Sequence, residues 1–234
     1  MGKFVLVHGG CHGAWCYSRV AELLRGEGHS VYTPTLSGVG ELAHLAAQSI
    51  NLSTHVQDVV SLFESLDLDD VVLCGHSYGG LVITGAAGRI GERIRSLFYL
   101  DAMLADDGQS LFDTLGPEET FTLLQLAGET GTTVQPPPAE FFQVNPADRE
   151  WVDAHCTPHP IGSFIQKLRY TGREDLVRHR TYVLARGNPG NLRFYDKVKG
   201  QPGWKTVVVD CGHDVMVDEP VQLSRLLLEE LKRD

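Results

Sequence analysis

The sequence predicts an α/β protein with a doubly wound, mostly parallel six-stranded sheet and a cap inserted after the fourth strand. Six short apolar runs alternate with segments of helical periodicity, as in strands that are joined by crossover helices. One strand passes directly into a glycine-rich turn and a helix, between residues 71 and 90. The alternation stops between residues 105 and 179. We therefore assign residues 1–104 and 180–234 to the core and 105–179 to the cap.

The first three elements form a strand-helix-strand unit. Lys3–His8 is a short apolar run and predicts a buried strand. Trp15–Glu27 has apolar residues at helical spacing and ends in a glycine-rich stretch, which predicts a helix. Ser30–Thr33 predicts a second strand that ends at Pro34. A crossover of this length favours parallel strands.

A loop and a helix lead to the third strand. Leu36–Leu52 has no clean period and predicts a loop over one face of the sheet. Thr54 and Gln57 fit a capping box, so we expect the next helix to begin at Thr54. Its apolar stripe continues to Leu66.

The third strand and the helix after it enclose the most informative motif in the chain. Val71–Cys74 runs without a spacer into Gly-His-Ser-Tyr-Gly, which is the G-x-S-x-G pattern of a nucleophile elbow. A strand that reverses into a helix this sharply crowds its own backbone, so Gly75 and Gly79 can hardly carry side chains. Ser77 would then stand exposed above the sheet edge, before a helix over Leu81–Ile90.

The predicted cap follows the fourth strand, Ser96–Asp101. A run of three prolines and a glycine-rich stretch interrupt any regular alternation, although Glu118–Leu126 and Pro146–His155 have helical patterns. Such an insertion covers the carboxyl ends of the strands, where it can act as a lid. Its larger apolar residues would provide surface for an aryl or alkyl group: Phe112, Phe121, Leu124, Phe141, Phe142, Trp151, Phe164 and Tyr170.

Regular alternation resumes after the cap. Thr181–Ala185 and Thr206–Val209 predict the last two strands, with a helix near Leu192–Lys199 between them. We expect Asp218 to be the N-cap of the final helix, because a proline follows within its first turn.

Composition excludes several classes of partner. The net charge of −10 argues against nucleic acid and anionic membranes, which both need a basic surface. No run approaches the roughly 18 apolar residues of a membrane span, and the N-terminal apolar run is too short for a signal peptide. Five scattered cysteines without a C-x-x-C pair predict free thiols in a reducing cytoplasm. The oligomeric state stays open, a homodimer included.

Three candidates for an acyl-transfer site stand at strand ends: the His8–Gly13 turn, Ser77 and His213. A serine hydroxyl needs a base to accept its proton, and His213 follows the last strand at a place from which it would face Ser77. The acid that orients this histidine is less clearly marked. The turn after Thr181–Ala185 offers Asn188 but no carboxylate, whereas Asp101 ends the fourth strand. We favour Asp101 over Asn188 acting as a neutral orienter.

The oxyanion of such a reaction also needs hydrogen-bond donors. The backbone N–H of Tyr78 follows the nucleophile and would be one donor. The Gly9–Gly10 turn after the first strand would supply the other, most simply from Gly10. His8 and His76 lie beside these motifs, and we interpret them as supporting residues.

With these motifs, the whole chain resembles the α/β-hydrolase superfamily, and within it the plant methylesterase and hydroxynitrile lyase group with its bacterial esterase relatives. The motif HG-x-x-HGAW at residues 8–15 carries most of this resemblance, together with the elbow, Thr54-His55 with Asp58, and Gly212-His213-Asp214. The resemblance implies Ser77 as nucleophile and His213 as base. The chain departs from plant members because it lacks an aspartate near Asn188.

The same comparison separates related reactions. Hydroxynitrile lyases of this group use a threonine where this chain has Gly9 and a lysine where it has Asp214, so cyanohydrin cleavage is the weaker interpretation. Dehalogenases and epoxide hydrolases need an aspartate at the position of Ser77.

We therefore expect a serine esterase that cleaves small to medium carboxylic esters and needs no metal or cofactor. We expect His12, Trp151 and Phe121 to contact the substrate. An amide or carbamate hydrolase would use the same catalytic residues, and a ligand-binding receptor with slow turnover would keep the same fold.

Overall fold

The computed structural model describes residues 1–47, 49–128 and 131–233 and contains one six-stranded sheet. All neighbouring strands in it are parallel, in the order β2-β1-β3-β4-β7-β8. The predicted fold class is thereby confirmed. The strands are β1 (Lys3–Val7), β2 (Ser30–Tyr32), β3 (Val71–His76), β4 (Ile94–Leu100), β7 (His179–Ala185) and β8 (Trp204–Val209).

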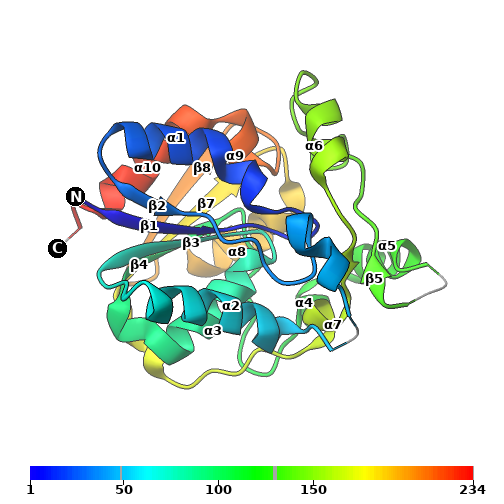
Figure 1. Ribbon diagram of the computed structural model, residues 1–234, viewed down its shortest axis with the longest axis horizontal. Coiled ribbons are helices and arrows are strands. Elements are labelled where there is room, and N and C mark those ends of the chain that lie inside the picture. The colour runs from blue at the N-terminus through cyan, green and yellow to red at the C-terminus, as the bar shows by residue number, and fades with distance from the viewer. Residues whose placement is uncertain (48, 129–130, 234) are drawn as a thin grey trace.

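Helices cover both faces of the sheet (Figure 1). The apolar side chains of α1 (Ser18–Gly26), α9 (Val215–Asp218) and α10 (Pro220–Glu230) pack in one core cluster. Those of α2 (Leu52–Ser65), α3 (Gly79–Ile90) and α8 (Leu192–Val198) pack in the other. Because every residue of β3 is buried, the central strand needs the uninterrupted apolar run that the sequence shows.

Two predicted helix starts are wrong. The capping box of α2 pairs Asn51 with Thr54, whose backbone N–H donates to Asn51 Oδ1 at 3.1 Å, so Thr54 lies inside the helix. Asp218 ends α9 instead of capping α10, which begins at Pro220. The Asp218 carboxylate accepts hydrogen bonds from the backbone N–H groups of Asn145 and Gly212.

The structure also contains short 3-10 helices that the sequence analysis did not distinguish. One of them, η1 (Ala14–Tyr17), precedes α1, and η2 (Gly40–Leu45) lies within the predicted loop after β2. Two others, η3 (Gly91–Arg93) and η5 (Pro189–Asn191), lie between larger elements.

Most of the short elements between β4 and β7 lie beyond the carboxyl ends of the strands (Figure 1), whereas the chain near Arg173 packs against α3 and η3. We keep the name cap for residues 105–179. The antiparallel pair β5–β6 had no counterpart in the sequence analysis. The elements are α4 (Leu111–Thr114), α5 (Pro117–Leu126), β5 (Thr133–Val134), α6 (Arg149–His155), β6 (His159–Pro160), α7 (Gly162–Ile165) and η4 (Arg173–Leu176).

Polar contacts fasten the second half of the cap to the core. Arg19 makes a bidentate ion pair with Asp148, with N–O distances of 2.5 and 2.8 Å. Asn145 donates to Asp218 from both its backbone and its side-chain amide.

No helix within the described residues is long and apolar enough to cross a membrane.

Candidate active site

Ser77 occupies a strained turn between β3 and α3. Its φ angle is 54°, in the left-handed region that costs an L-residue about 1–3 kcal/mol. A Cβ on Gly75 would lie 2.5 Å from the carbonyl oxygen of Gly79, and one on Gly79 would lie 2.8 Å from that of His8. Both elbow glycines are therefore required by the close approach of backbone, as the sequence indicated.

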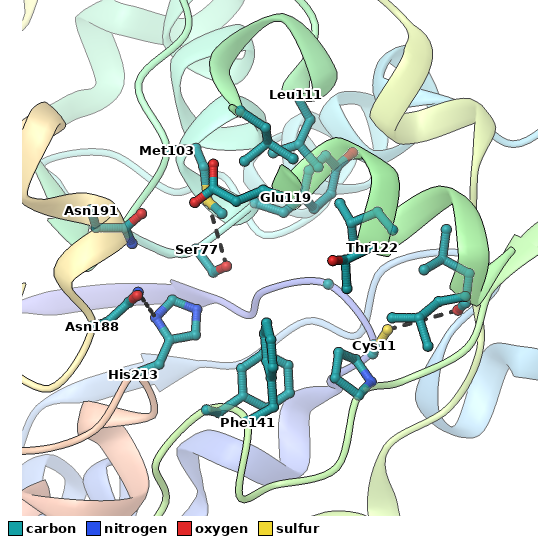
Figure 2. Close-up of a pocket in the computed structure, with 18 of the residues that line it drawn as sticks. Cys11, Ser77, Met103, Leu111, Glu119, Thr122, Phe141, Asn188, Asn191 and His213 are labelled. Atoms are coloured by element: carbon teal, nitrogen blue, oxygen red, sulfur yellow. Dashed lines mark hydrogen bonds between the residues drawn. The ribbon is translucent and has the colours of Figure 1, made fainter. Parts of the chain in front are cut away.

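The Ser77 hydroxyl lies on the wall of a pocket, between Met103 and His213 (Figure 2). It donates a hydrogen bond to Met103 Sδ, with an Oγ–Sδ distance of 3.6 Å. Transfer of its proton to the histidine therefore requires the Ser77 hydroxyl to turn from Met103 toward the imidazole. Catalytic hydrogen bonds are often loose before substrate binds, so this geometry is compatible with a nucleophile.

His213 is held in place by backbone, carboxylate and aromatic contacts. Its backbone N–H donates to the carbonyl oxygen of Phe142 at 2.8 Å, and the Phe142 ring stacks on the imidazole with centroids 5.7 Å apart. The Nδ1 atom lies 2.6 Å from Asp101 Oδ2. The ring orientation is thus fixed from the core and from the cap together.

Asp101 is fully buried and forms the centre of this polar arrangement. Its Oδ1 accepts a hydrogen bond from the backbone N–H of Ala185 at 3.0 Å, and its Oδ2 accepts one from Asn188 Nδ2 at 2.7 Å. Asn191 also binds the carbonyl oxygen of Asp101, at 2.6 Å. The carboxylate is therefore oriented by three neighbours, counting His213.

Both candidate orienters of the histidine reach it, but with different chemistry. Asn188 Nδ2 lies 3.1 Å from His213 Nδ1, the contact that is drawn in Figure 2. When Nδ1 carries the proton that it donates to Asp101, it cannot also accept one from an amide nitrogen. The shorter Asp101 contact fits that tautomer, so the geometry favours Asp101 as the orienter and Asn188 as a donor to Asp101.

The residues that carry the two expected oxyanion donors line the same pocket. The backbone N–H groups of Gly10 and Tyr78 have no hydrogen-bond partner among the described residues, and both residues line the pocket. The Tyr78 side chain is anchored below, because its hydroxyl lies 2.9 Å from Nδ1 of His55. His55 is buried, which lowers its pKa and favours this neutral acceptor.

The pocket has a volume of about 360 Å³ and lies between core and cap. Ser77 and His213 line it from the core, beside Asn188 and Asn191. The cap contributes mainly apolar side chains: Leu111, Leu115, Leu123, Leu126, Val134, Phe141, Phe142 and Phe164. Glu118, Glu119 and Gln143 add polar groups. A pocket of this size and lining fits a small, largely apolar molecule.

Three residues that we expected to contact substrate are not among those that line this pocket. His12 is buried, and its ring binds Asp214 and the carbonyl oxygen of Gly10. Trp151 packs edge-on against Trp15, and Phe121 is 61% exposed. Spacing along a chain does not show which way a cap side chain points. We therefore expect the residues that line the pocket, and not these three, to contact the substrate.

Other residues of the site were missed by the sequence analysis. Met103 follows Asp101 by two residues, and proximity to a strand end was the one signal that pointed to it. His159 is fully buried, and its Nδ1 accepts a hydrogen bond from the backbone N–H of Cys11 at 3.2 Å. Gln143, with a φ of 56°, carried no sequence signal at all.

Two curated proteins are similar to this chain over nearly its whole length. The chain is 45% identical to a carbendazim hydrolyzing esterase of Nocardioides sp. (strain SG-4G), over 97% of this chain and 98% of the relative. It is 27% identical to methylesterase 10 of Arabidopsis thaliana, over 97% and 90%.

A solved structure is similar over nearly the whole length. It is an extracellular α/β-hydrolase from a Paenibacillus species, described as sharing structural and functional homology with tobacco Salicylic Acid Binding Protein 2. The TM-score is 0.86 at 25% identity, and the match covers 98% of this chain and 99% of that one. The sequence profile of the alpha/beta hydrolase family matches residues 4–226. The chain therefore belongs to the alpha/beta hydrolase family.

Proposed function

We propose that the protein is a serine hydrolase that cleaves small to medium carboxylic esters through an acyl-enzyme. The observation that carries the proposal is the buried contact of 2.6 Å between Asp101 and His213, beside a strained Ser77 on the wall of an apolar pocket. A nucleophile, a base and an orienting acid are thereby available in one place.

In the first half of the reaction, Ser77 Oγ attacks the acyl carbon while its proton passes to His213 Nε2. The carbonyl oxygen becomes an oxyanion that the N–H groups of Gly10 and Tyr78 stabilise, each by on the order of 3 kcal/mol. The imidazolium is stabilised by Asp101 and gives its proton to the leaving alcohol. In the second half, His213 activates a water molecule that releases the acid and restores Ser77.

The pocket favours substrates with an apolar group beside the reacting carbonyl. Leucine, valine and phenylalanine side chains form most of the cap side of the pocket. Its volume suits an aryl or short alkyl group and excludes long acyl chains unless the cap moves. Polar groups of Asn188 and Asn191 from the core, and of Gln143 from the cap, also line the pocket, where they can accept or donate hydrogen bonds.

Carbamate hydrolysis is a second candidate because of one relative. The name of the Nocardioides protein specifies carbendazim, a methyl carbamate, and that protein matches this chain over nearly its full length. A carbamate carbonyl would be attacked by the same serine and held by the same donors. The two substrate classes differ in the leaving group and in the shape that the pocket must accept.

Turnover of matched substrates tests the proposal. We would measure hydrolysis of aryl and methyl esters of short acids, and of aryl methyl carbamates, by the wild type and by Ser77→Ala. Ester turnover that the substitution lowers by about 10⁴-fold or more is expected. Turnover of carbamates above esters would favour the second candidate, and equal rates for wild type and Ser77→Ala would contradict both.

A further inference from the structure

The mechanism above leaves a buried ion pair unused. His12 and Asp214 are 1% and 0% exposed, and His12 Nε2 lies 3.0 Å from Asp214 Oδ2. The other ring nitrogen, Nδ1, lies 2.8 Å from the carbonyl oxygen of Gly10. Because both nitrogens face acceptors, both carry a proton, and His12 is an imidazolium.

The ionisation of the pair agrees with this geometry. Burial alone would lower the pKa of His12, but attraction to the Asp214 carboxylate and a hydrogen bond with it raise that pKa above its ordinary value. Burial likewise opposes ionisation of Asp214, and His12 outweighs it, so that the pKa of this carboxyl is lowered to about 2.

His12 acts on the peptide groups that surround one oxyanion donor. The Gly10 carbonyl oxygen accepts from His12, and the Gly9 carbonyl oxygen accepts from His8 Nδ1 at 2.7 Å. The next N–H, that of Cys11, donates to His159 Nδ1 at 3.2 Å. The Gly10 N–H alone among these groups has no partner within the described residues, which leaves it free to point at the pocket.

Asp214 connects this loop to the base of the reaction. Asp214 directly follows His213 in the chain, so a displacement of one residue's backbone also displaces the other. His76 Nε2 donates to the carbonyl oxygen of His213 at 3.0 Å and lies 3.8 Å from Asp214 Oδ1. One charged pair thereby joins the loop after β1, which carries an oxyanion donor, to the loop after β8, which carries the imidazole.

We propose that His12, which is held by Asp214, is a positioning residue that sets the direction of the Gly10 N–H relative to His213. The proposal rests on the proposed function, because it concerns the oxyanion hole of that reaction. A purely structural role is the competing explanation. Buried ion pairs are weak sources of stability compared with apolar side chains of similar volume, so stability alone gives little reason for charges at this place.

Two substitutions of His12 separate the explanations, because each keeps one of its two contacts. In His12→Asn the side-chain amide nitrogen takes the place of Nδ1, keeps the bond to Gly10 and abandons Asp214. In His12→Gln it takes the place of Nε2, keeps the bond to Asp214 and abandons Gly10. We expect His12→Gln to have the higher melting temperature, because it leaves no buried carboxylate unpaired.

Activity should run in the opposite order. A misdirected donor near a reacting atom lowers the rate by about 100-fold, so we expect that loss of kcat in His12→Gln with KM within about threefold of wild type. We expect His12→Asn to keep kcat within about tenfold of wild type. Activity that follows melting temperature, or rates within threefold of wild type in both variants, would overturn the proposal.

A third variant keeps the test valid if His12→Asn does not fold. In Asp214→Asn the neutral His12 keeps its proton on Nδ1 for Gly10 and accepts an amide proton at Nε2, so kcat should stay within about tenfold of wild type. Glu230→Gln is the matched control. Glu230 is a buried carboxylate held by Ser96 and Thr181, away from the pocket, and its loss should lower the melting temperature without changing kcat. Asp214→Asn as inactive as His12→Gln would contradict the proposal.

A transition-state mimic supplies a readout that partial unfolding cannot move. An aryl trifluoromethyl ketone adds reversibly to the serine and places an oxyanion in the hole. Its inhibition constant should rise in His12→Gln in parallel with the fall in kcat/KM. An unchanged inhibition constant would overturn the proposal, whereas absence of turnover in the wild type would instead refute the esterase function on which it rests.

Discussion

At the scale of residues, the proposed reaction depends on how the Asp101 carboxylate is held by its hydrogen-bond partners. Asp101 has a φ of 42° and is held by Ala185, Asn188 and His213. Its charge is buried, so its value to the reaction lies in stabilising the imidazolium that forms after Ser77 loses its proton. Asn188 donates a hydrogen bond to Asp101 Oδ2, the oxygen that also contacts His213, and so limits how far the carboxylate can rotate.

Substitutions of these two residues should therefore differ strongly. Asp101→Asn should lower kcat by about 10⁴-fold, because an amide cannot hold the imidazole in the required tautomer. Asn188→Ala should cost only about tenfold, because the carboxylate keeps its other partners. Steady-state kinetics on one aryl ester measures both, and an Asn188→Ala variant as inactive as Asp101→Asn would contradict this division of roles.

The sequence was sufficient to propose some of these residues and not others. Ser77 could be recognised because a strand, two glycines and a helix constrain it sterically, and His213 because it follows the last strand. The choice between Asp101 and Asn188 needed distances, since both stand at strand ends that converge on one point. His12 was assigned to substrate because spacing alone cannot show that its ring points down to Asp214.

At the scale of elements, the elbow and the helix cap follow from local sterics and hydrogen bonding. The β3–α3 turn requires two glycines because backbone atoms lie within 3 Å of where a Cβ would be. The start of α2 depends on a side chain that satisfies a free N–H, and Asn51 does this one turn before the position that the sequence suggested.

Gly75→Ala tests the steric requirement. Its methyl group would lie 2.5 Å from the backbone of Gly79, so we expect a loss of about 2–3 kcal/mol in the free energy of unfolding. Gly26→Ala is the control, because no atom lies within 4 Å of the added carbon; it should be neutral or stabilising. Urea denaturation measures both, and equal stabilities would show that the turn can relax.

The helix cap offers a second element-scale test. Asn51→Ala should destabilise the protein by about 1 kcal/mol, because it removes the acceptor of the Thr54 N–H. Gln57→Ala, at the position that the sequence suggested, should change stability by less than about 0.5 kcal/mol, since the Gln57 side chain is exposed and donates a hydrogen bond to the exposed Ser61. The opposite ranking in thermal or urea unfolding would instead favour the predicted capping box of Thr54 and Gln57.

The cap, residues 105–179, was the part of the fold that the sequence predicted least well. Its strands β5 and β6 have two residues each, too short for any period to be read. Its position depends on contacts with distant residues, such as Arg19 with Asp148 and Thr157 N–H with the carbonyl oxygen of Cys11. The sheet, by contrast, is predicted by short apolar runs, which can be recognised in the sequence without knowledge of distant contacts.

At the scale of the whole molecule, the site rests on a layer of buried histidines. His8, His55, His76 and His159 are fully buried and have lowered pKa values, chiefly because burial penalises their charged form. The pKa of His8 falls from 6.5 to about 3. Burial therefore favours the neutral form of each ring in the folded protein, and unfolding in mild acid favours its protonation.

This layer predicts a steep loss of stability below pH 6.5. The unfolded chain binds protons there that the folded chain does not, so each such histidine removes up to about 1.4 kcal/mol per pH unit as pH falls. Asp214, whose pKa of about 2 lies below its ordinary value, adds a loss only below about pH 4. His12 has the opposite sign, because its pKa is raised, and its contribution is complete below pH 6.5.

Urea unfolding at pH 7.5, 6.0 and 5.0 measures this dependence. We expect the free energy of unfolding to be highest at pH 7.5 and to fall with increasing slope through the other two values. A stability that stays constant from pH 7.5 to 5.0 would mean that these histidines are not held neutral in the fold.

Identification of the acylated residue tests whether Ser77 is the nucleophile. We would incubate wild type and Ser77→Ala with an aryl ester of a slowly hydrolysed acid, quench in acid, and map the added acyl mass by peptide mass spectrometry. The account predicts one acyl group on the peptide that contains Ser77 in the wild type and none in the variant. An acyl group on Cys11, which lines the same pocket, or ester turnover by Ser77→Ala at the wild-type rate would contradict it.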